Sequence, residues 1–187
     1  MSRKRAIWLT IGGVLVVVLM AGLAIFQPWL LFVDKEVDEG DDAGAVVGTA
    51  SGGLTDTAVP SADGAGETRV VLASAEFIDA EHGTTGTAVI YRRSDGSRSL
   101  RIEDLDTSNG PDLHVWLTDR PSGGDCDGCR GSWGIYDDGA YVELGALKGN
   151  QGSQNYEIPD DADLAPMRSV VIWCDRFNVA FGTAAIG

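Results

Sequence analysis

An uninterrupted apolar segment near the N-terminus constrains this chain more than any other feature. Residues 6–26 read AIWLTIGGVLVVVLMAGLAIF and contain no charged side chain. About 20 apolar residues in an α-helix cross the ~30 Å hydrocarbon core of a bilayer. Trp8 and Trp29 lie near the two ends of this segment, where aromatic residues favour the membrane interfaces. The segment therefore predicts a transmembrane helix.

The charges on either side of the apolar segment predict its orientation. Three basic residues precede it at positions 3–5, whereas six acidic residues follow it between positions 34 and 42. The positive-inside rule keeps such an N-terminus in the cytoplasm. We predict a single-pass signal-anchor in the plasma membrane, with the C-terminal domain outside the cell. A cleaved signal peptide is the alternative, but the apolar run exceeds the ~7–15 residues of a usual h-region and no clear A-x-A site follows.

Composition divides the chain into three parts. Residues 1–33 are the predicted cytoplasmic stub and anchor. Residues 34–68 are rich in Asp, Glu, Gly, Ala, Ser and Thr and contain no aromatic residue. Such a segment buries too little apolar surface to offset the entropy cost of ordering it, so it predicts a flexible acidic linker. Residues 69–187 are predicted to form one extracytoplasmic β domain.

Residues 69–187 show a pattern typical of an all-β fold, because short apolar runs alternate with Gly, Asn, Asp and Pro. The turn residues Ser94-Asp95-Gly96-Ser97 predict a hairpin. Seven strands are expected, at residues 69–73, 86–92, 99–105, 112–118, 141–144, 169–174 and 176–181. This number of strands in about 118 residues favours a β-sandwich or a barrel-like domain.

Two of the expected strands have informative side-chain patterns. Leu113, Val115 and Leu117 fall on one face because strand side chains alternate. The other face carries Asp112, His114 and Trp116. The run VVIWC at residues 170–174 is apolar on both faces, which indicates a central strand covered on both sides.

The charge of the exported part argues against one class of function. After residue 33 the chain holds 11 basic and 28 acidic residues, a net charge of −17. Nucleic-acid binding needs a basic surface, so we expect no nucleic-acid partner. The excess of acidic residues indicates solubility and repulsion from anionic surfaces, with cation binding as the functional alternative.

Three cysteines are the first candidates for chemistry, at positions 126, 129 and 174. An oxidising compartment favours disulfides, and an odd number leaves at least one thiol unpaired within the monomer. In the chain-entropy model a Cys126–Cys129 bridge contributes ~2 kcal/mol, and a bridge from Cys174 to either partner ~4 kcal/mol. The short bridge contributes less stability and is easier to reduce, which suits redox cycling. A structural disulfide that fixes the local loop is one alternative. A metal site is another, although a lone C-x-x-C lacks a second pair of ligands. Cys174 is either a redox sulfur or a buried apolar residue.

The two histidines are weaker candidates for binding a cofactor. His114 could ligate a metal or haem iron, or it could be a hydrogen-bonded packing residue. His82 precedes Gly83 and predicts a turn. No hydrolase or transferase signature accompanies these histidines. Acidic loop residues could bind calcium or be simply solvated, although no EF-hand spacing is present; these are Asp119, Asp125, Asp127, Asp137 and Asp138.

Six motifs along the third part occur in an order that resembles the DM13 domain family. They are FIDAEHGTTGTA from Phe77, LRIEDL from Leu100, GPDLHVWL from Gly110, LGALKG from Leu144, GSQNY from Gly152 and VVIWCDRFNVAFG from Val170. The resemblance covers about residues 71–186. It implies an extracellular β-sandwich-like domain related to DOMON domains, with a proposed electron-transfer or redox role for a cysteine.

The resemblance also suggests which residues matter. The family cysteine corresponds to Cys174, and the family histidine corresponds to His82. Cys126 and Cys129 lie in a loop that does not match the family. We therefore expect a membrane-anchored redox module in which Cys174 is the reactive sulfur and the other two cysteines form its exchange partner or a staple, acting with a redox partner protein. A non-catalytic binding or adhesion module is one alternative. A haem or metal carrier using His114, by analogy with DOMON relatives, is another.

Overall fold

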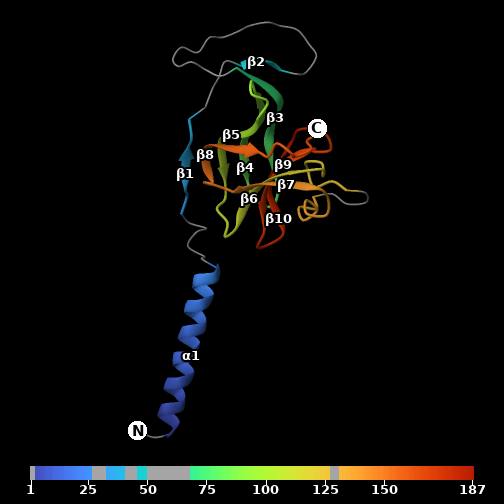
Figure 1. The fold of residues 1–187 in the computed structure, drawn as a ribbon. Helices are drawn as coiled ribbons and strands as arrows, with labels where there is room; N and C mark the ends of the chain where they lie inside the picture. The colour runs from blue at the N-terminus through green and yellow to red at the C-terminus, as the bar shows by residue number, and fades with distance from the viewer. Residues whose placement is uncertain (1–2, 27–32, 41–45, 50–67, 127–130) are drawn as a thin grey trace.

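The computed structural model describes residues 3–26, 33–40, 46–49, 68–126 and 131–187 (Figure 1). One helix, α1 (Arg3–Phe26), extends away from a β domain that contains the rest of the described chain. The large apolar side chains of α1 from Ile11 to Ile25 are exposed. Within the described part of the chain, no helix has the length and apolar character required to cross a membrane.

The β domain is built from ten strands in the described residues. They are β1 (Glu36–Asp38), β2 (Val46–Thr49), β3 (Arg69–Asp79), β4 (Thr84–Arg93), β5 (Arg98–Thr107), β6 (Leu113–Thr118), β7 (Tyr141–Ala146), β8 (Gln151–Ile158), β9 (Ser169–Cys174) and β10 (Val179–Ala185). Nine of them follow one another across a single sheet in the order β1-β8-β5-β4-β3-β10-β9-β6-β7, and β2 pairs with β3 outside this path.

The sheet is curled into a half-barrel. Strand β3 makes the curl, because its first part pairs with β4 and its last three residues, Phe77 to Asp79, pair with β10. The expectation of a mostly β domain is confirmed, and the architecture is one curled sheet. The predicted hairpin is also present, since the backbone nitrogen of Gly96 donates to the carbonyl of Arg93 over 3.0 Å and Gly96 has a φ of 92°.

The main core fills the concave side of this sheet. Leu113, Val115 and Leu117 of β6 point into it, as their alternation predicts. The opposite face of the same sheet region is covered by described residues of the loop 119–140, namely Trp133, Ile135 and Tyr136, which pack on the buried Trp116 and Trp173. All six residues of β9 are buried, which confirms that this strand is central and covered on both sides.

Residues 33–40 lie against the β domain instead of starting a flexible linker. Strand β1 pairs in parallel with the first residues of β8. The backbone nitrogen of Lys35 donates to the Asn150 side chain over 2.7 Å, and the carbonyl of Lys35 accepts from Gln151. The segment expected to be a flexible linker, residues 34–68, therefore contains two described strands, β1 and β2, that pair with strands of the β domain. Backbone pairing offsets part of the entropy cost of ordering such polar segments. Residues 41–45 and 50–67 lie outside the described residues.

Strands β1, β2 and β8 were not among the expected strands, and β3 runs to Asp79, beyond its expected end at residue 73. Strand β8 was not expected, because its sequence QGSQNYEI is polar; its buried Gln154 is nevertheless satisfied by hydrogen bonds to Gly149 and Tyr156. The last expected strand, residues 176–181, begins too early, because residues 175–178 form the turn between β9 and β10.

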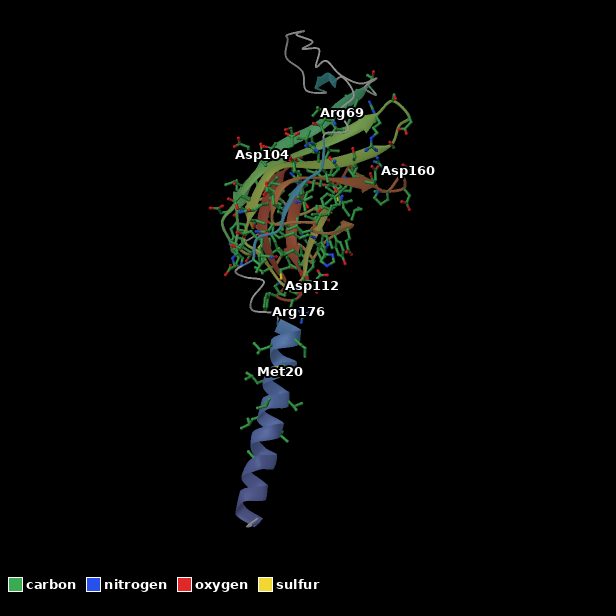
Figure 2. The ribbon with its side chains drawn as sticks, turned by 90° about the vertical axis from the view of Figure 1, so that its left-hand side faces the viewer. Met20, Arg69, Asp104, Asp112, Asp160 and Arg176 are labelled. Atoms are coloured by element: carbon green, nitrogen blue, oxygen red, sulfur yellow. The ribbon has the colours of Figure 1, made fainter. Side chains whose placement is uncertain are left out.

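The two ends of the β domain are well separated. Figure 2 shows Asp112 and Arg176 together at the end next to α1, whereas Arg69 and Asp160 lie toward the other end. We call the first end the domain tip and define it as the loop of residues 108–112 together with the turn of residues 175–178. The two parts touch, because the backbone nitrogen of Asp175 donates to the carbonyl of Asp112 over 3.0 Å.

Candidate functional site

Cys174 lies at the end of β9, immediately behind the domain tip. It pairs with Leu113 of β6 and Val179 of β10, and its side chain belongs to the main core. Cys174 is a free cysteine with an exposed fraction of 0%. Burial raises the pKa of its thiol, although backbone N–H groups of Phe177 and Arg176 donate to the sulfur and act in the opposite direction. Since the thiolate is the reactive form, both the burial and the raised pKa of Cys174 disfavour reaction at its sulfur.

His114 is surrounded by three carboxylates. Its Nδ1 lies 2.7 Å from a Glu143 oxygen, and its Nε2 lies 3.2 Å from an Asp112 oxygen. Asp175 lies 3.7 Å from the same Nε2. Partial burial disfavours the charged ring, but the hydrogen bonds from Asp112 and Glu143 and the charge of Asp175 outweigh this and raise the pKa of His114.

Both ring nitrogens of His114 are thus engaged by carboxylates. An iron or other metal ligand needs a ring nitrogen with a free lone pair, so the geometry favours a hydrogen-bonded, charged histidine. The described residues also contain no group of three or more His, Cys, Asp or Glu side chains that could hold a metal ion. Of the proposed calcium ligands, Asp127 lies outside the described residues.

His82 lies in the turn between β3 and β4, as predicted. Its ring packs on Phe181 with a centroid distance of 4.0 Å and an interplanar angle of 39°. Its carbonyl accepts a hydrogen bond from the Thr84 hydroxyl over 3.3 Å. These contacts give His82 a packing role. No contact between His82 and His114 is present in the described chain.

Cys126 lies in the loop of residues 119–140, on the convex side of the sheet. Two hydrogen bonds fix the loop around it: the Gly124 nitrogen donates to the Tyr136 hydroxyl over 2.9 Å, and the Ser132 nitrogen donates to the Gly124 carbonyl. Gly124 has a φ of 64°, and a Cβ there would lie 2.9 Å from the Ser132 nitrogen and from the Trp133 ring. Glycine is therefore required for this turn.

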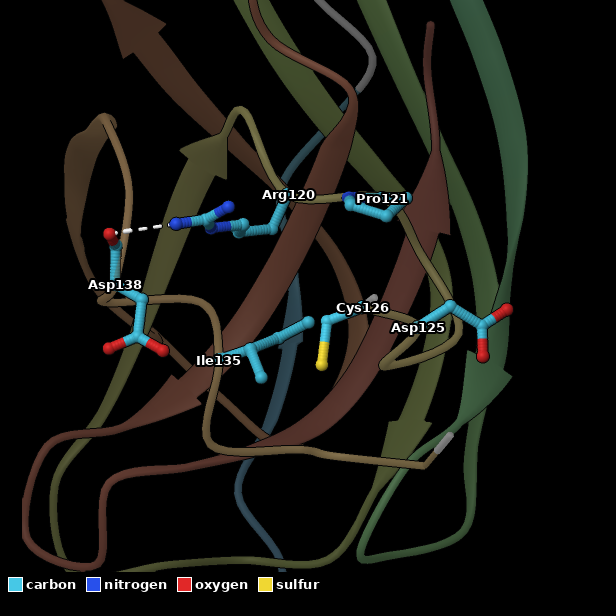
Figure 3. Close-up of a pocket in the computed structure, with 6 residues that line it drawn as sticks. All are labelled: Arg120, Pro121, Asp125, Cys126, Ile135 and Asp138. Atoms are coloured by element: carbon cyan, nitrogen blue, oxygen red, sulfur yellow. Dashed lines mark hydrogen bonds between the residues drawn. The ribbon is translucent and has the colours of Figure 1, made fainter. Parts of the chain in front are cut away.

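The sulfur chemistry of Cys126 differs from that of Cys174. Cys126 is exposed and disulfide-bonded. It lines an open pocket of about 660 Å³, shown in Figure 3, together with Arg120, Pro121, Asp125, Ile135 and Asp138. One guanidinium nitrogen of Arg120 donates to the Asp138 carbonyl over 2.8 Å at the rim. Cys129 lies outside the described residues.

The sheet separates the two kinds of sulfur. Cys174 points into the concave core, whereas its neighbour Trp173 points to the convex side, under the loop that carries Cys126. Because β9 is a central strand, an exchange between Cys174 and Cys126 would require opening the sheet. The structure therefore does not bring together the predicted reactive sulfur and its predicted exchange partner.

Sequence reasoning missed an aromatic cluster on the convex side. Trp116 stacks on Tyr141 at a centroid distance of 4.2 Å and on Trp173 at 5.1 Å. The alternation of β6 placed Trp116 beside His114 but gave no sign of Tyr141, which comes from the next strand in space. Of the acidic partners of His114, Asp112 was expected on the same face, whereas Glu143 and Asp175 were missed because they come from other segments of the chain.

The comparison with protein families agrees with this fold. The family model described as electron transfer DM13 matches residues 76–186, which include β4 to β10, the domain tip and the loop of residues 119–140. No curated protein and no solved structure matches the chain significantly. The matched segment is more than half of the 187 residues. The chain therefore belongs to the DM13 family of electron-transfer domains.

Proposed function

We propose that this protein is a membrane-anchored, extracytoplasmic electron-transfer module in which a disulfide between Cys126 and Cys129 accepts two electrons to become a dithiol and returns them when it is reoxidised. One observation carries the proposal: Cys126 is exposed and disulfide-bonded at an open pocket, whereas Cys174 is a fully buried free thiol. With Cys126 bonded and Cys174 free, Cys129 is the remaining cysteine in the chain.

The pocket gives an incoming thiol access to Cys126. Thiol–disulfide exchange requires a thiolate to reach a disulfide sulfur. Arg120 places a positive charge at the same pocket, which favours a thiolate, while Asp125 and Asp138 oppose it. Nε of Arg120 lies 3.8 Å from an Asp119 carboxylate oxygen, which offsets part of the guanidinium charge at the pocket.

The proposed reaction is exchange with a dithiol protein. A thiolate of the partner attacks Sγ of Cys126, the Cys126–Cys129 bond breaks, and Cys129 leaves as a thiolate that takes up a proton. The partner's second thiol then loses its proton and attacks the mixed disulfide, which releases Cys126 as a thiol. Two electrons and two protons pass to this protein, and the partner becomes a disulfide. The reverse sequence returns them.

The proposed anchor is the segment of residues 6–26. Its uncharged sequence, the preceding basic residues and the exposed apolar side chains of α1 support this role. Flotation of the full chain with phosphatidylcholine vesicles tests it. We expect the protein to float with the vesicles at high salt and at alkaline pH; recovery in the soluble fraction would contradict an integral anchor.

A redox titration of the full chain tests the cysteine assignment. The protein is poised in dithiol buffers, alkylated and mapped by mass spectrometry. We expect Cys126 and Cys129 to become reactive together at a potential above the about −300 mV typical of structural disulfides, and Cys174 to react only after denaturation. Cys126→Ser should abolish electron exchange with a reduced dithiol protein, whereas Cys174→Ser is the matched control and should retain it.

Two results would contradict the proposal. One is a Cys126 disulfide that stays oxidised until the potential falls below about −300 mV, as structural disulfides do. This result would favour a non-catalytic binding module. The other is loss of exchange in Cys174→Ser with full activity in Cys126→Ser, which would return the reactive role to Cys174.

A further inference from the structure

The segment of residues 33–40, which we call the strap, follows the proposed anchor directly and is fastened to the β domain along its whole length. At its start, the Asn109 side chain donates to the Val33 carbonyl over 2.9 Å. At its end, the Lys148 ammonium contacts the two Glu39 carboxylate oxygens at 2.7 and 2.9 Å. Glu39 also accepts a hydrogen bond from the backbone nitrogen of Asn155 over 2.7 Å.

The β domain is shaped to receive the strap. A Cβ on Gly149 would lie 2.4 Å from the Lys35 carbonyl oxygen, and a Cβ on Gly152 would lie 2.1 Å from the Val37 carbonyl oxygen. Both obstacles are backbone atoms, so a side chain at either position would push the strap away. Asn150 has an exposed fraction of 2%, and its side chain bonds the strap and the Thr107 carbonyl at once. The receiving residues lie inside the family match, whereas the strap lies outside it.

The strap shortens the connection between the β domain and α1. Six residues separate Phe26, the last residue of α1, from Val33. At ~3.5 Å per residue these seven peptide steps span at most about 25 Å. Without the strap, the connection would run from Phe26 to Arg69. A flexible chain of that length has an average end-to-end distance on the order of 35 Å, and its fully extended length is far greater.

The strap also determines which end of the domain lies close to α1. Asn109, which holds Val33, belongs to the loop of residues 108–112 in the domain tip. Figure 2 shows this tip, with Asp112 and Arg176, facing the end of α1. Phe177 in the same tip has an exposed fraction of 59%, the highest of any large apolar side chain described in the β domain.

We propose that the strap holds the domain tip against the lipid surface that contains the anchor, with Phe177 and Arg176 in contact with the interface. An aromatic ring and an arginine are side chains that favour the region of the lipid headgroups. Asp112 and Asp175 make the tip acidic, so attraction to anionic lipids does not bring it there; the short connection does. The inference rests on the proposed anchor but is independent of the cysteine assignment.

The test uses the full chain in phosphatidylcholine nanodiscs, with 4-fluorophenylalanine at position 177 and a nitroxide on the lipid headgroups. We expect strong paramagnetic broadening of the fluorine signal at position 177. Val37→Pro removes a backbone donor from β1, and Glu39→Gln weakens the contacts to Lys148 and Asn155; both changes lie in the strap and leave the β domain sequence intact. Each should reduce the broadening several-fold and increase hydrogen exchange at the Gln151 and Asn155 amides.

Glu36→Gln is the matched control, because Glu36 is an exposed strap carboxylate with no hydrogen bond in the described structure. It removes the same charge and should change neither signal. A chain that stays in the nanodisc but shows no broadening at position 177 contradicts the proposal and leaves the anchor intact. A chain that does not enter nanodiscs or float with vesicles contradicts the anchor itself, and the inference with it.

Discussion

Cys174 shows how burial determines the role of a single residue. Its side chain is packed in the main core, and its carbonyl accepts a hydrogen bond from the Phe177 nitrogen of the turn of residues 175–178 over 3.2 Å. We expect Cys174→Ala to lower the free energy of unfolding by about 1–3 kcal/mol, because removal of the buried sulfur leaves a cavity in the main core. Cys174→Ser keeps the volume but places a hydroxyl in an apolar core, so it should also destabilise the fold. Urea unfolding of the two variants measures both losses, and stabilities equal to that of the unchanged protein would contradict close packing around the sulfur.

His114 is the second residue whose surroundings permit a prediction. Because Asp112 and Glu143 outweigh burial and raise its pKa, the folded state binds its proton more tightly than the unfolded state. The resulting stabilisation is fully present below the unfolded pKa of about 6.5 and is lost as pH rises through the folded pKa. Glu143→Gln should lower the pKa measured by NMR titration of the ring. An unchanged pKa in this variant would contradict the ion-pair geometry.

At the scale of elements, the strap should be sensitive to acid. The hydrogen bond from Lys148 is the main cause that lowers the pKa of Glu39. A depressed carboxyl pKa contributes stability above the unfolded value, and this stability is lost as pH falls through the folded value. We expect the Gln151 and Asn155 amides to lose protection from hydrogen exchange below about pH 4 while β4 and β5 remain protected. Simultaneous loss in all of these strands would show that the strap does not open independently.

The aromatic cluster joins β6, β7 and β9. Trp116 is 4% exposed and stacks on residues of both neighbouring strands. We expect Trp116→Leu to lower the free energy of unfolding by about 2–4 kcal/mol through lost packing. Tyr141→Leu should cost less, because Tyr141 is 47% exposed. Thermal unfolding of both variants tests this order, and a larger loss for Tyr141→Leu would contradict it.

The sequence patterns predicted the elements that depend on local alternation and missed those that depend on distant polar partners. The apolar run of β9 and the alternation of β6 were sufficient to place both strands. Strand β8 was not predicted, because the hydrogen-bond partners of its buried Gln154 come close only in the folded protein. The ordered strap was not predicted, because its partners Asn109 and Lys148 lie more than 70 residues further along the chain. The contrast between buried Cys174 and exposed Cys126 also required the fold, since both residues are simply cysteines in the sequence.

At the scale of the whole molecule, the proposed redox cycle should leave the fold intact. A bridge that closes about four residues contributes ~2 kcal/mol in the chain-entropy model, and it lies in a loop outside the main core. We expect reduction to lower the free energy of unfolding by about this amount without populating an intermediate. Denaturant curves of the oxidised and reduced protein, followed by fluorescence and circular dichroism, test this. A second transition on reduction would show that the loop of residues 119–140 unfolds separately.

The stacking of Trp116 and Trp173 has an optical consequence. Their ring centroids lie 5.1 Å apart, with an angle of 28° between the planes. Two indole rings this close share their electronic excitation, and such sharing produces a pair of bands of opposite sign in the far-ultraviolet circular dichroism spectrum. These bands overlap the weak signal of β strands, so the strand content read from such a spectrum will be distorted. The same bands provide a label-free signal for the convex side of the sheet, which disappears when β6 and β9 separate.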